Sequence, residues 1–145
     1  FAVHKMSELE NKSEINYDSA RILHDKAHYP SVAHCSYYSC YQLFRHIWFY
    51  KMGKTDSDLK FITDHSKNKR AERKGSHDIL INEIQLYIKG NNSSDFRVIN
   101  SNIMQLKRLR SSADYDDKAF LYSESLNSIQ LSDILRPVLK KYLRK

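Results

Sequence analysis

Apolar residues recur along this chain at the spacing expected of amphipathic helices, and the segments that carry them follow one another with few interruptions. Tyr29-Pro30 and Gly90-Asn91-Asn92 mark two interruptions, because proline disfavours a helical conformation in the residue before it and glycine commonly ends a helix. The pattern predicts helices over residues 7–26, 30–52, 76–90, 95–115 and 123–143. We therefore expect an all-α protein of four to five helices, with one domain over residues 1–145.

The segment 30–52 has the widest apolar face. Its apolar side chains fall within one half of the helical wheel, and they are Val32, Ala33, Tyr37, Cys40, Leu43, Phe44, Ile47 and Trp48. The polar side chains that occupy the rest of the wheel are Ser31, His34, Ser39, Gln42, Arg45 and His46. An apolar face this wide predicts a central helix that packs against more than one neighbour.

Residues 53–75 carry scattered apolar side chains and a basic run, and we expect them to form a long mobile loop. Arg70, Arg73 and Lys74 belong to the basic run. Two interpretations remain open for this loop. It is either an arm that contacts RNA or a partner, or a charged segment that is simply solvated.

The last predicted helix, residues 123–143, contains a proline. Its apolar stripe consists of Leu131, Ile134, Leu135, Val138 and Tyr142. Pro137 lies inside that stripe, so the sequence predicts a kink or a break near Asp133.

Composition narrows the class of protein. With only 3 Gly and 2 Pro in 145 residues, the chain lacks the turn residues that an all-β sandwich or barrel requires. It has no run of about 20 apolar residues, so no membrane span is expected. Cys35 and Cys40 would lie about 140° apart on one helix, which favours free thiols and a reducing, cytoplasmic setting. The net charge of +7 favours acidic partners such as nucleic acid.

The segment 95–115 contains a charge within its apolar face. Ile103, Leu106, Leu109 and Ala113 define an apolar arc about 120° wide, and Arg110 falls inside it. Such a cation needs a partner, since an unpaired charge in an apolar setting costs several kcal/mol.

Asp114 lies one helical turn after Arg110, at the edge of the same arc. Either the two form a partly buried ion pair that fixes helix packing, or Arg110 points into a cleft and binds a phosphate. Lys107, Arg108 and Tyr115 lie off the arc and should face solvent or a partner.

Three segments resemble the HEPN family of helical domains. They are the stretch 29–38 with its paired tyrosines Tyr37-Tyr38, the Gly75-Ser76-His77 opening of a helix, and the run 110–115, which reads Arg-Ser-Ser-Ala-Asp-Tyr. The resemblance covers residues 17–143. It implies an up-and-down helical bundle, a homodimer, and association with nucleotidyltransferase partners, toxin–antitoxin pairs or RNA cleavage.

The chain departs from the ribonuclease members of that family. Those members carry an Arg, four to six residues, and then a His, but the corresponding positions after Arg110 are Tyr115, Asp116 and Asp117. Cleavage through the ribose 2′-hydroxyl needs a group that exchanges protons near neutral pH, as histidine does and tyrosine does not. Arg70 and His77 match the spacing formally, but we interpret that match as coincidence because it lies in the basic loop.

The sequence thus predicts a HEPN-type module that binds RNA or a nucleotide, in a prokaryotic toxin–antitoxin or defence setting, with no cofactor and no metal site. Arg110, Lys107, Arg108, Arg70, Arg73 and Lys74 are the predicted binding residues. One alternative is a metal-independent ribonuclease toxin with Asp114 or Tyr115 in place of the histidine, so that Arg110, Asp114 and Tyr115 are the catalytic candidates. The other is a non-catalytic dimerisation or scaffold domain.

Overall fold

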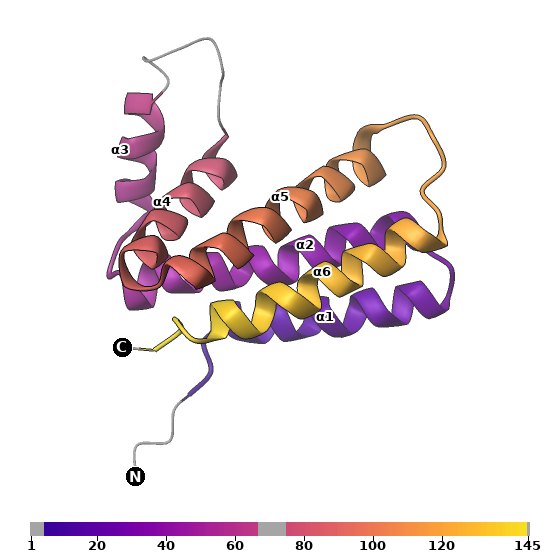
Figure 1. Ribbon diagram of the computed structural model, residues 1–145, viewed down its shortest axis with the longest axis horizontal. Coiled ribbons are helices and arrows are strands. Elements are labelled where there is room, and N and C mark those ends of the chain that lie inside the picture. Colours follow the sequence, from indigo (N-terminus) through magenta and orange to yellow (C-terminus); the bar gives the residue numbers. More distant parts are fainter. Residues whose placement is uncertain (1–4, 67–74, 145) are drawn as a thin grey trace.

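The computed structural model describes residues 5–66 and 75–144, and its regular structure in these ranges is entirely helical (Figure 1). The helices are α1 (Glu8–Asp25), α2 (Tyr29–His46), α3 (Asp56–Ser66), α4 (Ser76–Asn91), α5 (Ser93–Tyr115) and α6 (Tyr122–Lys140), and the π-helical turn η1 (Ile47–Lys51) continues α2. The all-α prediction is confirmed, with six helices in the described ranges instead of the four to five expected. None of the described helices combines the length and apolar character needed to span a bilayer.

Helix α2 is the centre of the molecule. It packs against α1, α4, α5 and α6, and Figure 1 shows α1, α2 and α6 running alongside one another while α5 crosses them. All eight apolar side chains predicted for its inner face are buried. Ser39 and His46, which were expected on the polar face, are buried as well. They are accommodated by hydrogen bonds, since the Ser39 hydroxyl donates to the Ser36 carbonyl at 2.7 Å and His46 Nε2 lies 2.8 Å from the Leu143 carbonyl.

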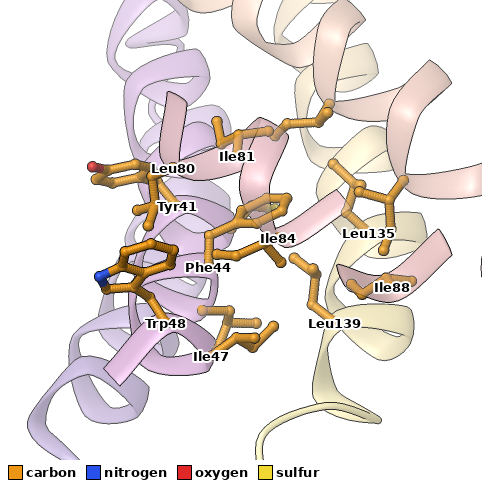
Figure 2. Close-up of a cluster of buried hydrophobic side chains, with 14 of the residues drawn as sticks. Tyr41, Phe44, Ile47, Trp48, Leu80, Ile81, Ile84, Ile88, Leu135 and Leu139 are labelled. Atoms are coloured by element: carbon orange, nitrogen blue, oxygen red, sulfur yellow. The ribbon is translucent and has the colours of Figure 1, made fainter. Parts of the chain in front are cut away.

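The main hydrophobic core gathers side chains from every described helix except α1. Phe44 of α2 lies close to Ile84 of α4 and Leu139 of α6 (Figure 2), and Trp48 of η1 belongs to the same cluster. Helix α1 is attached in another way, with a small apolar contact through Ala20 and several polar links to α6. The core therefore fixes α4, α5 and α6 relative to α2.

The predicted loop over residues 53–75 is wrong in its first half, because residues 56–66 form α3. Thr55 and Asp58 form a capping box: the Thr55 N–H donates to Asp58 Oδ2 at 2.8 Å, and the Asp58 N–H donates to Thr55 Oγ1 at 3.1 Å. The Thr55 N–H and the Thr55 hydroxyl both donate to Asp58 Oδ2, and these two bonds lower the pKa of Asp58. Leu59 is buried in the main core, which ties α3 to α4. Residues 67–74 lie outside the described part of the chain.

Of the kink or break predicted near Asp133, the break is wrong, because α6 continues through Pro137 without interruption. Pro137 and Asp133 are exposed, so water can replace the helical donor that proline removes from the Asp133 carbonyl. Leu135 and Leu139 on either side of the proline are fully buried. The packing of these two leucines in the core holds α6 in place on both sides of Pro137.

Candidate functional site

The three segments that carry the family resemblance meet in space. Tyr37, Tyr38 and Tyr41 lie in the middle of α2, His77 lies in the first turn of α4, and Arg110 lies near the end of α5. The Arg110 guanidinium lies 4.9 Å from the centre of the Tyr37 ring and 5.8 Å from that of Tyr38. The His77 ring stacks on Tyr41 with the centroids 3.9 Å apart. These five residues, together with His34 and Asp114, form what we call the Arg110 cluster.

Arg110 is the charge at the centre of this cluster. Its side chain is 14% exposed, and Nη1 lies 3.6 Å from Asp114 Oδ2, so the predicted ion pair is confirmed. That contact is too long for a hydrogen bond. The guanidinium forms no hydrogen bond with any residue in the described ranges, and its Nε is buried without a partner. Burial opposes the charge, but Tyr38, Tyr37 and Asp114 together raise the pKa of Arg110, so the group stays protonated.

His77 lies beside Arg110 and is partly buried. Its Nδ1 lies 3.2 Å from the Tyr37 hydroxyl, and its ring meets the Tyr38 ring edge-on at 6.0 Å. Burial and the nearby Arg110 charge lower the pKa of His77 below its ordinary value. The imidazole is therefore neutral near pH 7 and able to accept a proton.

Two tyrosines of the cluster, Tyr37 and Tyr41, are neutral donors. Burial raises the pKa of Tyr37 well above the ordinary value of a phenol and also raises the pKa of Tyr41. Both hydroxyl groups consequently keep their protons throughout the physiological range. They can donate hydrogen bonds to a ligand or a neighbour but cannot act as bases near neutral pH.

His34 and Asp114 close the cluster on the side facing solvent. His34 Nδ1 lies 3.4 Å from Asp114 Oδ2, and the His34 ring lies 4.7 Å from that of Tyr38. The carboxylate of Asp114 is thus shared between a guanidinium and an imidazole, with a quarter of the side chain exposed. An incoming anion would compete with this single carboxylate for Arg110.

The remaining predicted residues on α5 take different positions. Lys107 was expected to face solvent or a partner. Instead, its ammonium pairs with Asp78 in the first turn of α4. Arg108 is exposed and has no ion-pair partner among the residues that the structure describes. Tyr115 is 77% exposed. The predicted binding residues Arg70, Arg73 and Lys74 lie outside the described residues.

Sequence reasoning did not assign His77 to the site. The residue was part of the family resemblance, but its spacing from Arg70 suggested only coincidence, and nothing in the sequence relates it to Arg110. Its position depends on how α4 packs on α2. No group of three or more His, Cys, Asp or Glu side chains in residues 5–66 and 75–144 is arranged to hold a metal ion, and both cysteines are free thiols.

Comparison of the chain with family models, with curated proteins and with solved structures finds no match. The HEPN resemblance therefore stays a prediction, based on the three sequence segments that meet at Arg110.

Proposed function

We propose that this protein is a HEPN-type module that binds RNA or a nucleotide by holding a phosphate group at Arg110. The observation that carries the proposal is the state of this guanidinium. It has five N–H donors, yet it forms no hydrogen bond with any described residue and has one carboxylate at 3.6 Å. A phosphate can accept two parallel hydrogen bonds from a guanidinium, which makes it the best-fitting ligand.

The surroundings of Arg110 favour a strong interaction with an anion. The side chain lies over two tyrosine rings and is mostly buried, so the effective dielectric constant around it is well below that of water. The His34 ring, half exposed beside the cluster, and the exposed Tyr115 offer surfaces on which a base can stack. The net charge of +7 would attract a polyanion towards the whole molecule.

The test is to measure the affinity for a labelled single-stranded RNA by fluorescence anisotropy. We expect the affinity to fall steeply between about 50 and 200 mM salt, because phosphate contacts release counterions. Arg110→Met, which keeps the volume of the side chain, should weaken binding roughly 10- to 100-fold, the range for losing hydrogen bonds to a charged group. Arg110→Lys should restore part of the affinity, since lysine keeps the charge but not the paired donors.

Arg97→Met is the matched control. Arg97 lies on the same helix, is exposed, and belongs to no contact of the Arg110 cluster. Arg97→Met should weaken RNA binding only by the loss of the long-range attraction of one surface charge. The proposal fails if the protein shows no salt-dependent affinity for RNA, or if Arg110→Met and Arg97→Met behave alike.

A metal-independent ribonuclease is the second candidate, and the position of His77 favours it. The imidazole lies next to Arg110 although no histidine follows Arg110 in the sequence, and burial and that guanidinium lower its pKa. A neutral imidazole there could accept the proton of a ribose 2′-hydroxyl while Arg110 holds the phosphate. Cleavage of RNA that is lost in both His77→Gln and Arg110→Met would support it, and cleavage that persists in both would exclude it.

The biological setting belongs to the same proposal. A nucleotide- or RNA-binding module of this type would fit a prokaryotic toxin–antitoxin or defence system in the cytoplasm, as a homodimer or beside a nucleotidyltransferase. Co-purification with the product of the neighbouring gene would test the partner, and light scattering would test the dimer.

A further inference from the structure

A groove between α4 and α5 is separate from the Arg110 cluster. Its volume is about 550 Å³, which lies in the usual range for small-molecule sites. The side chains that line it come from successive turns of the two helices, and Arg110 is not among them. Part of the wall is apolar and consists of the buried Ile81 and Ile103 and the half-exposed Met104.

Three carboxamides line the same groove. Asn82 and Gln85 belong to α4 and Asn100 to α5, and none of them hydrogen-bonds to any residue within the described part of the chain. Gln85 is 7% exposed as a whole residue, but its amide atoms keep access to the groove, since neither is among the buried side-chain atoms that lack a partner. Each of these groups offers two N–H donors and a carbonyl acceptor to whatever occupies the groove.

The charges at the edge of the groove leave one cation available. Asp78 pairs with Lys107, and Asp116 lies 3.8 Å from Lys118. Arg108, the other charged residue of the lining, has no ion-pair partner among the described residues. The groove therefore combines a partly apolar wall, side-chain amides that bond to no described residue, and the exposed Arg108 guanidinium, which pairs with no described carboxylate.

We infer that this groove is a pocket for a nucleobase, with the base between the apolar walls and its edge hydrogen-bonded by Asn82, Gln85 and Asn100. Carboxamides match the mixed donors and acceptors of a base edge, as the pairing of Asn or Gln with adenine illustrates. The phosphate of the same nucleotide lies at Arg108. The inference rests on the proposed function in taking RNA or a nucleotide as the ligand, and adds a second contact region that selects the base.

The experiment measures binding of the four nucleoside 5′-monophosphates and of ribose 5-phosphate, which lacks a base, by titration calorimetry. We expect one or two nucleotides to bind more tightly than ribose 5-phosphate. Gln85→Met keeps the shape of the side chain but not its amide. It should lower the affinity for those nucleotides roughly tenfold and leave the affinity for ribose 5-phosphate unchanged. Gln130→Met is the matched control, because Gln130 is exposed on α6, outside the groove, and it should bind like the unmodified protein.

Three results would overturn the inference. The first is that nucleotides bind no better than ribose 5-phosphate, and the second is that Gln85→Met binds them as the unmodified protein does. The third is that Gln85→Met changes the molar mass measured by light scattering, which would assign the groove to a second copy of the chain. Gln85→Met should fold, because the amide that it removes bonds to no described residue. If Gln85→Met does not fold, Asn100→Leu is the second variant.

Arg110→Met separates this inference from the proposed function. If RNA binding is insensitive to Arg110→Met while Gln85→Met still lowers nucleotide affinity, the role of Arg110 is wrong and the pocket stands. If Arg110→Met abolishes RNA binding while Gln85→Met has no effect, the pocket is wrong and the proposed function stands.

Discussion

His77 is a side chain of the candidate site whose pKa changes on folding. Its ring stacks on Tyr41, its Nδ1 reaches the Tyr37 hydroxyl, and the Arg110 charge lies nearby. Burial is the main cause that lowers the pKa of His77, the Arg110 charge adds to it, and the nearby Asp78 carboxylate offsets only part of the effect. The folded protein therefore resists protonation of this imidazole, whereas the unfolded chain does not.

We expect this resistance to make stability depend on pH. Because the folded pKa of His77 is below the ordinary value of 6.5, the unfolded chain binds more protons in this range, and the free energy of unfolding should fall as pH drops from about 7 to 5. In His77→Gln that contribution is absent. Urea unfolding at a series of pH values should give a shallower pH dependence for the variant, and equal slopes would contradict the assigned surroundings of His77.

Arg110 shows what helical periodicity can and cannot predict about a residue. Its position one turn before Asp114 followed from spacing along one helix, and the ion pair with Asp114, one of the two interpretations that this spacing left open, is present. The tyrosine rings beneath it and the imidazole beside it come from α2 and α4. No spacing within α5 contains that information.

At the scale of the element, α3 illustrates a local signal that was missed. Thr55-x-x-Asp58 has the spacing of a capping box and precedes the apolar residues Leu59 and Ile62. The low number of apolar residues between 53 and 75 and the basic run after them concealed it. A short helix of this kind is stabilised by its cap and by a few core contacts.

The cap of α3 can be tested directly. Thr55→Val removes the hydroxyl that accepts from the Asp58 N–H, and should destabilise α3 by about 1 kcal/mol. Hydrogen exchange should then become faster in α3 while the buried part of α2 keeps its protection. Thr63→Val is the control, since the Thr63 hydroxyl donates to the Leu59 carbonyl inside the helix and caps nothing. Equal exchange in the two variants would contradict the role of Thr55.

At the scale of the whole molecule, one core joins α2 to the four helices that follow it. Leu135 is fully buried in that core, and Figure 2 shows it on α6 across from Ile84 and Ile88 of α4. Trp48, the single tryptophan, is buried in the same cluster. Its fluorescence therefore reports on the core, while circular dichroism reports on all the helices.

We expect Leu135→Ala to lower the free energy of unfolding by about 3 kcal/mol, because it leaves a cavity where several helices meet. The tryptophan and circular dichroism transitions in urea should coincide for the variant and for the unmodified protein, as in a single cooperative unit. Ile134→Ala, one residue away on the exposed side of α6, should cost much less. Transitions that separate would mean that α1 or α3 unfolds independently of the core.

By itself, the sequence determined the helical class, the inner face of α2 and the placement of Arg110 and Asp114 one turn apart on the apolar side of α5, because each depends on the spacing of residues along one helix. Only the tertiary structure decided that His77 lies beside Arg110, that Ser39 and His46 are buried, and that α6 passes through Pro137 unbroken. These features depend on which helices pack together and in what register. That arrangement reflects the sum of contacts between segments far apart in the chain, so no short stretch of sequence contains it.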